Sequence, residues 1–179
     1  MKYALIVLAA IVALVLVIVA VGAILPVKHR ASRQINLHQP AESVFALIND
    51  PATLPAWRGK VKGSKEMKVE ILRDRNGHRM FRETGADGTI LYEVVSAEPN
   101  KRLVTRIADP SLPFGGKWTY EILPAGDSTT LRITEDGEVY NPVFRFASRF
   151  IFGHHATIEQ YLRDVAKRFG EDSAVVTQA

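Results

Sequence analysis

The first feature of the chain is an apolar run at residues 3–25, which carries no charged side chain and ends before Pro26. As a helix rising about 1.5 Å per residue, it would be about 34 Å long, enough to cross a hydrocarbon core of about 30 Å. A cleaved signal peptide is the alternative, because Lys2 supplies a basic start and residues 21–23 are small enough for cleavage. The apolar core of such peptides has only about 7–15 residues, so the length favours a retained anchor at residues 1–26.

Beyond this run, alternating apolar and polar residues predict an antiparallel sheet of about seven strands. Ile35 and Leu37 alternate with polar neighbours in the first strand. Turn-forming residues such as Asn76 and Gly77 separate the following segments, and these dipeptides are typical of hairpins. The predicted strands are 33–38, 67–73, 78–84, 89–97, 102–108, 117–123 and 129–139.

Helical patterns lie on both sides of the strand-rich region. Pro40 opens a short helix, and 53–57 has room only for a second short helix or a turn. After Pro142, apolar residues recur every three or four positions as far as Phe169, which predicts one long amphipathic helix of about seven turns. Gly153 interrupts this pattern at a cost of about 1 kcal/mol relative to alanine, so we expect a kink or a close approach to the sheet there.

These elements divide the chain into four parts. We expect a transmembrane anchor at 1–26, a basic linker at 27–32, one α+β domain at 33–170 and a flexible tail at 171–179. A soluble part of roughly 140–150 residues is the usual size of a single domain.

Charge favours a membrane partner over nucleic acid. The 23 basic residues are mixed with 19 acidic ones, so we expect no nucleic-acid binding despite the net charge of +4. The excess lies mostly at 28–33, next to the bilayer, and at 58–65, where ordinary solvated charge is an equal explanation. The positive-inside rule favours a cytoplasmic soluble domain. The chain has no cysteine, which excludes disulfides and cysteine-based metal sites but does not decide the compartment.

Three segments carry a resemblance to known proteins: PAESVFALINDP at 40–51 followed by Trp57, GKWTY at 116–120, and TLRITE at 130–135. In this order they resemble the START-like helix-grip superfamily, also called SRPBCC, which includes polyketide cyclase/dehydrase-like proteins and lipid-transfer domains. The resemblance implies a curved antiparallel sheet wrapped on the long C-terminal helix, two short helices closing one end, and a hydrophobic pocket between helix and sheet. It says little about function, because the superfamily shares a cavity and no common catalytic set.

Aromatic side chains are the main candidates to line such a pocket. In this architecture we expect ligand contact from Tyr92, Trp118, Tyr120, Tyr140 and Phe146, which offer apolar area together with a few hydroxyls. The alternative is that they fill the core.

Glu135 is a carboxylate in line with apolar neighbours, since it follows Leu131 and Ile133 in strand alternation. A buried carboxylate needs a partner, so we expect it to pair with Arg106 or Arg132, or to act on a ligand. A local bulge that turns Glu135 outward is the third possibility.

The sequence predicts no metal site and no cofactor. His154 and His155 are adjacent, and neighbouring helical residues point about 100° apart, so the two cannot chelate one ion. His154 shares the apolar stripe, where it is either a buried core histidine or a group pointing into the cavity. There is no Gly-x-Ser-x-Gly nucleophile elbow and no glycine-rich phosphate loop.

Three functional hypotheses follow. The first is a non-catalytic binder of a lipid or other hydrophobic small molecule, held at the bilayer by residues 3–25. The second is a cofactor-free cyclase or dehydratase that uses Glu135 as a general base. The third is a membrane-tethered interaction module with a filled core and no ligand.

Overall fold

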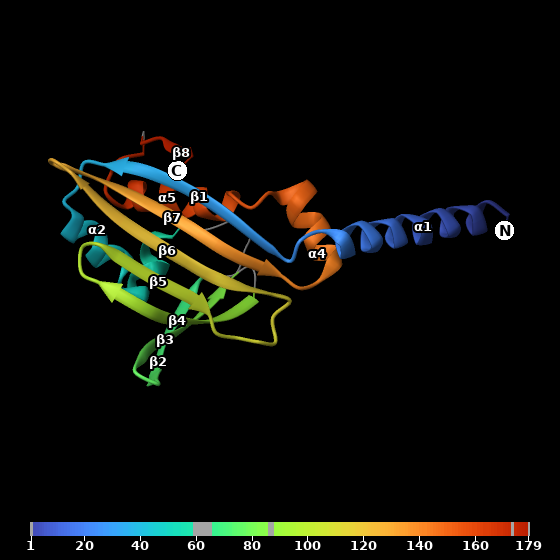
Figure 1. Ribbon diagram of the computed structural model, residues 1–179, viewed down its shortest axis with the longest axis horizontal. Helices are drawn as coiled ribbons and strands as arrows, with labels where there is room; N and C mark the ends of the chain where they lie inside the picture. Colours follow the sequence, from blue (N-terminus) through green and yellow to red (C-terminus); the bar gives the residue numbers. More distant parts are fainter. Residues whose placement is uncertain (1, 59–65, 86–87, 173, 179) are drawn as a thin grey trace.

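The computed structural model describes residues 2–58, 66–85, 88–172 and 174–178. Most of the basic stretch 58–65 therefore lies outside the described residues. An N-terminal helix, α1 (Lys2–Ile24), projects from one end of an α+β domain (Figure 1). By length and composition α1 can cross a membrane, and a signal sequence satisfies the same criteria.

The domain is built on one curved antiparallel sheet, as predicted. Eight strands are described, in the order β2-β3-β4-β5-β6-β7-β1-β8, so consecutive hairpins join β2 to β7 and β1 closes beside β7. Their bounds are β1 Lys28–Leu37, β2 Lys68–Arg75, β3 His78–Gly85, β4 Gly88–Glu98, β5 Arg102–Ile107, β6 Phe114–Ala125, β7 Ser128–Val139 and β8 Val176–Gln178.

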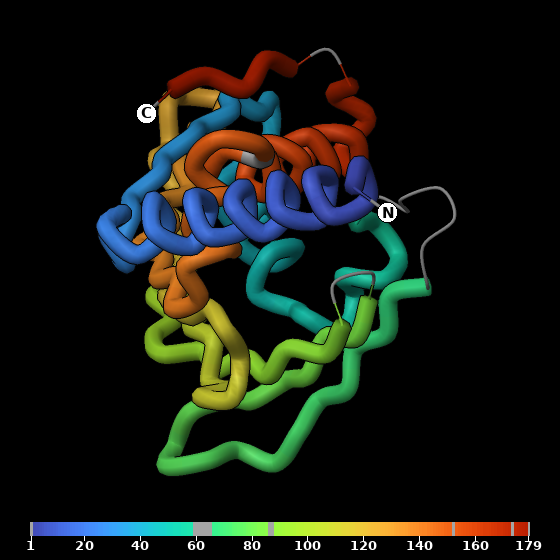
Figure 2. Tube along the Cα trace, turned by 90° about the vertical axis from the view of Figure 1, so that its right-hand side faces the viewer, coloured from blue at the N-terminus to red at the C-terminus, as the bar shows by residue number. Residues whose placement is uncertain are grey.

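Helices cover the inner face of the sheet. After β1 come α2 (Ala41–Ile48), η1 (Pro51–Thr53) and α3 (Leu54–Trp57), and after β7 come α4 (Pro142–Ala147), η2 (Ser148–Phe152) and α5 (Ala156–Arg168). The two views agree that α5 runs along the inner side of the curved sheet, with α1 and α4 together at one end (Figures 1 and 2). This is the predicted helix-grip arrangement.

Two predicted boundaries differ from the structure at the ends of the domain. The stretch 27–32, predicted as a linker, is mostly the first half of β1, which pairs with β7 from Lys28 onward. The predicted flexible tail contributes β8, which pairs with β1. The Glu171 carboxylate helps to hold this segment, because it accepts a hydrogen bond from the backbone N–H of His38 at 2.9 Å.

The prediction of one continuous C-terminal helix is wrong. The Asn141 side chain accepts hydrogen bonds from the first N–H groups of α4, so a helix does begin there. The next five residues, η2, widen into a π-helical turn, and Gly153 then adopts a left-handed φ of 72° that ends the run. Only α5 forms the long grip helix, and α4 turns away towards α1.

α1 and α4 are joined by specific contacts. Gly22 is buried, and a Cβ at this position would overlap the carbonyl of Pro142, so the two backbones approach closely. Arg145 donates a hydrogen bond of 2.8 Å to the carbonyl of Leu25, just beyond the last turn of α1. The carbonyls at a helix C-terminus need such donors.

The main core lies towards the other end of the domain, where α2 and one face of α5 pack on β1, β6 and β7. Its members have almost no exposed surface: Ile35, Leu37, Val44, Ile122, Leu131, Ile133, Ile158, Leu162 and Val165. Because this end is filled, any space for a ligand lies towards α1.

Candidate functional site

A cavity of about 580 Å³ lies between the sheet and the start of α5, on the α1 side of the core. Leu54 of α3 and Phe81 of β3 contribute apolar walls, and Phe144, Ala147 and Ser148 border it from α4 and η2. This cavity is far larger than the water-sized space that the hypothesis of a filled core predicts. The volume lies within the range of about 300–1,000 Å³ that is usual for small-molecule sites.

Five of the residues proposed from the sequence line this cavity: Tyr92, Trp118, Tyr120, Glu135 and His154. The sheet register explains three of them, because Trp118 lies directly opposite Glu135 and Tyr120 follows two positions later on the same face. The Trp118 ring also meets the Tyr161 ring of α5 edge-on, with centroids 5.8 Å apart.

The other two proposed residues, Tyr140 and Phe146, do not line the cavity. The hydroxyl of Tyr140 donates a hydrogen bond to Glu138, and its ring borders a separate groove instead. Phe146 faces Phe150 of η2 at 4.9 Å between ring centroids. Tyr140 lies outside the cavity because the chain turns at Asn141. Phe146 lies outside it because α4 is not continuous with α5.

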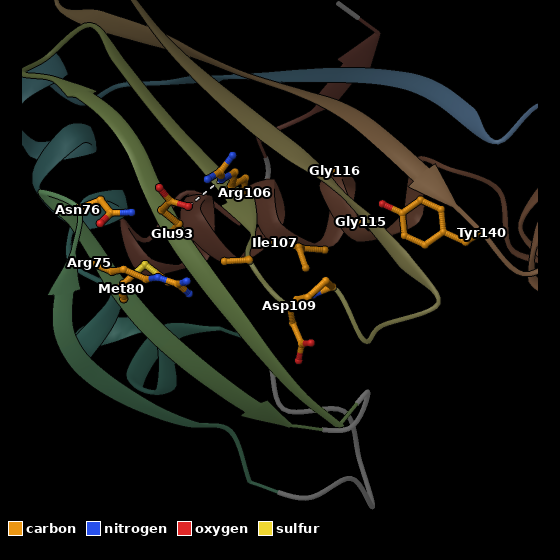
Figure 3. Close-up of a pocket in the computed structure, with 12 residues that line it drawn as sticks. Arg75, Asn76, Met80, Glu93, Arg106, Ile107, Asp109, Gly115, Gly116 and Tyr140 are labelled. Atoms are coloured by element: carbon orange, nitrogen blue, oxygen red, sulfur yellow. Dashed lines mark hydrogen bonds and ion pairs between the residues drawn. The ribbon is translucent and has the colours of Figure 1, made fainter.

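The separate groove has a volume of about 410 Å³ and lies near Arg106 and Tyr140 (Figure 3). Glu93 and Arg106 form an ion pair there at 2.7 Å, drawn as a dashed line. The Glu93 carboxylate also lies 3.8 Å from His78. Arg106 is thus committed to Glu93 and Arg132 to Glu121, so the prediction that either arginine pairs with Glu135 is wrong.

Glu135 pairs with a histidine instead. The Nε2 atom of His29 lies 3.3 Å from Oε1 of Glu135, and both side chains are mostly buried. The His154 ring stacks on the His29 ring at 3.9 Å between centroids. Gly137, opposite His29 in the register, leaves the space for this ring, because a Cβ there would overlap it. The cavity wall therefore carries a carboxylate and two imidazoles in contact.

The charge balance of this group favours neutral His154. Burial lowers the pKa of His154, and the neighbouring His29 ring lowers it further, against the opposite effect of the Glu135 carboxylate. Arg149 and His155 also act to lower this pKa. A neutral imidazole beside a carboxylate can accept or relay a proton, which is the chemistry required for general acid–base work.

A second polar group on the cavity wall was not predicted from the sequence. Arg58, at the end of α3, donates a hydrogen bond of 2.8 Å to Glu83 of β3, and both side chains line the cavity. The guanidinium also lies over the Tyr161 ring, 5.5 Å from its centroid. The sequence indicated this role for Arg58 only weakly, because the residue belongs to a basic stretch that ordinary solvated charge explains equally well.

Tyrosine hydroxyls extend this second group. Tyr120 is hydrogen-bonded to both Thr105 and Tyr161. Burial raises the pKa of Tyr120 to about 12 and also raises that of Tyr161 well above its usual value. Both phenols therefore stay protonated at neutral pH and can donate hydrogen bonds. Burial is the largest single influence on the Arg58 guanidinium and acts to lower its pKa. The Glu83 carboxylate and the neighbouring phenols of Tyr161, Tyr120 and Tyr92 together outweigh burial, so the pKa of Arg58 is raised.

Within the described residues, no cluster of three or more His, Asp or Glu side chains is arranged to hold a metal ion. The two polar groups lie in walls that are mostly aromatic and aliphatic, and further polar residues also border the cavity, among them Asn49, Thr105, Arg106, Lys117, Glu138 and Thr157. Such a cavity suits an apolar molecule that carries at least one hydrogen-bonding group.

The sequence of this domain matches a known family model. Residues 27–170 fit the family described as polyketide cyclase / dehydrase and lipid transport. The chain belongs to this family. The membership confirms the resemblance drawn from 40–51, 116–120 and 130–135, and it covers all of the elements that surround the cavity. No curated protein sequence matches the chain.

Solved structures share the fold of this polyketide cyclase / dehydrase and lipid transport domain. A START superfamily protein from Mycobacterium smegmatis is 22% identical with a TM-score of 0.61, over 80% of this chain and 98% of that one. Norcoclaurine synthase from Thalictrum flavum is 14% identical with a TM-score of 0.61, over 81% and 88% of the two chains. At these identities the likeness shows the helix-grip fold alone.

Proposed function

We propose that this protein is a membrane-anchored binding protein for a lipid or other hydrophobic small molecule. The observation that carries the proposal is the place of the cavity, which is bordered by α4 and η2, the segment that contacts α1. An apolar ligand that partitions into a bilayer would meet the opening of the cavity close to the membrane. The family description, which includes lipid transport, supports the same class of ligand.

The two polar groups narrow the class of ligand within this proposal. Arg58 and Glu83 neutralise each other, so the site offers both a donor and an acceptor without net charge. The Tyr120 and Tyr161 hydroxyls add neutral hydrogen-bonding capacity beside them. A neutral group such as a hydroxyl, a ketone or an amide on an apolar skeleton fits this end better than a free carboxylate.

Native mass spectrometry of the full-length protein extracted in detergent tests the proposal. Wild type is expected to retain a small molecule, and Ala147→Trp, which places an indole at the cavity border, is expected to lose it. Ala125→Trp, on an exposed turn at the far end of β6, is the matched control and should retain the molecule. An empty wild-type protein, or equal retention by Ala147→Trp, would contradict the proposal.

A cofactor-free enzyme is the second candidate, and the His29–Glu135–His154 contact is the observation that favours it. The Glu135 carboxylate would accept a proton from a bound substrate and share it with His29, 3.3 Å away, while His154 stacks on the His29 ring. The test compares the molecules retained by wild type and by Glu135→Gln. A simple binder retains the same molecule in both, whereas an enzyme accumulates a different species, the substrate, in the variant.

We also propose a cytoplasmic domain, because Lys28 and Arg30 follow the apolar helix closely. The chain has no cysteine, so Ser111→Cys provides a single reporter on an exposed loop. In sealed cells it should resist a membrane-impermeant maleimide until the membrane is opened. Labelling of intact cells would place the domain on the other side.

A further inference from the structure

The segment from α4 to η2 carries large apolar side chains that the domain leaves uncovered. Phe150 is 59% exposed and Ile151 67% exposed. Val143 and Phe144 add to the same segment at 41% and 49%. We call residues 142–152 the apolar shoulder. Several large apolar side chains exposed on one short segment point to a surface that contacts a partner.

The contacts with α1 decide which partner fits. The inference from these contacts rests on the proposed function, in which α1 spans the bilayer. A helix of 23 residues is about 34 Å long against a hydrocarbon core of about 30 Å, so its last turn lies at the membrane surface. Arg145 bonds to the carbonyl of Leu25, and Pro142 packs against Gly22. The apolar shoulder is therefore held at the depth where α1 leaves the bilayer.

The composition of the apolar shoulder suits that depth. Burying phenylalanine and isoleucine side chains at the boundary between headgroups and acyl chains is favourable, because it removes apolar surface from water. Arg149 is exposed beside Phe150 and Ile151. A guanidinium there can meet a lipid phosphate while the neighbouring apolar side chains point deeper, as basic residues at membrane surfaces do.

We infer that the apolar shoulder is a second membrane contact, inserted into the lipid interface next to α1. The same segment borders the cavity through Phe144, Ala147 and Ser148. Insertion of the apolar shoulder would bring this side of the cavity next to the bilayer, so that a ligand could pass between lipid and cavity without crossing bulk water. The partner is the lipid surface itself, and the contact fixes the tilt of the domain on the membrane.

Single-cysteine labelling of the full-length protein in nanodiscs tests this inference, because the native chain has no cysteine. An environment-sensitive nitrobenzoxadiazole label is placed at Ile151→Cys, with lipid made of phosphatidylcholine and phosphatidylglycerol. The matched control is Ile71→Cys on β2, which is 58% exposed and far from α4. Val12→Cys, in the middle of α1, reports whether the anchor spans the bilayer.

The expected result separates the three positions. The Ile151 label should show blue-shifted emission and be quenched by nitroxides at the lipid headgroup, the Val12 label by nitroxides deep in the acyl chains, and the Ile71 label by neither. If Val12 is quenched but Ile151 behaves like Ile71, the anchor stands and the second contact is refuted. If Val12 is not quenched either, the anchor itself fails and the inference falls with it.

Discussion

The ion pair between Arg58 and Glu83 gives the sharpest test of the cavity. Its side chains are only 22% and 16% exposed, so each charge depends on the other more than on water. Glu83→Gln removes the negative charge, keeps the shape and leaves the guanidinium facing an apolar wall. Breaking a fully buried pair costs about 3–5 kcal/mol. Because these side chains remain partly open to the cavity, we expect a loss of about 2 kcal/mol in the free energy of unfolding.

This loss is measurable by thermal unfolding of the full-length protein in detergent, followed by near-ultraviolet circular dichroism of the cavity aromatics. For a chain of this size, about 2 kcal/mol corresponds to a fall of roughly 4–8 °C in melting temperature. Glu70→Gln is the control, because its ion pair with Arg82 is much more exposed, at 61% and 42%. Such surface pairs contribute less than about 1 kcal/mol.

A double replacement, Arg58→Met with Glu83→Leu, completes the test. Apolar residues of similar volume often replace a buried ion pair without loss, so the double variant should be within about 1 kcal/mol of wild type. If Glu83→Gln were as mild as Glu70→Gln, the pair would be solvated through the cavity, and its assignment as a buried recognition group would be wrong.

Three further predictions concern the group of His29, Glu135 and His154 and the contact between α1 and α4. The pKa of His154 is lowered in the folded state, so folding opposes protonation of this ring. The contribution of His154 to stability is therefore complete above the ordinary pKa of 6.5 and is lost as the pH falls below it. On acidification, the melting temperature of wild type should fall more steeply than that of His154→Gln. Gly137→Ala should displace His29 and lower stability by about 1–3 kcal/mol, measured by the same unfolding assay, because the new methyl overlaps the ring. Gly22→Leu should separate α1 from Pro142 and broaden the spin-label distance distribution between α1 and the sheet, while the melting temperature of the domain stays unchanged.

The order of elements could be predicted from the sequence because each depends on local signals. Turn dipeptides such as Asn76-Gly77 mark hairpins, and both residues do have positive φ in the structure. The sequence marks Gly153, directly after η2, as an interruption of the helical pattern, but it does not show that the helix ends there. Apolar residues continue at helical spacing through it, and only the left-handed conformation of Gly153 separates α4 from α5. The contacts of Pro142 and Arg145 with the end of α1 hold α4 in a direction different from that of α5.

In the candidate site, too, local patterns could be predicted from the sequence, whereas contacts between distant segments could not. Strand alternation correctly placed Trp118, Tyr120 and Glu135 on one face, because a period of two needs no knowledge of the partner strand. The partner of Glu135 required the register, since His29 is 106 residues away and was predicted to lie in a linker. Arg58 was missed for a similar reason: its approach to Glu83 depends on how α3 closes over the sheet.

One face of α5 borders the cavity and another face packs in the core, and the sequence of α5 provides suitable side chains for each. Thr157 and Tyr161 are four positions apart and face the cavity, whereas Ile158, Leu162 and Val165 lie one step round the helix and are fully packed or nearly so. A cavity with a buried ion pair lowers stability locally, because it leaves aromatic and charged groups without close packing. The filled end of the domain offsets this cost. Along α5, a cavity-facing row and a core-facing row of side chains run side by side, so the same helix borders the cavity and holds the core.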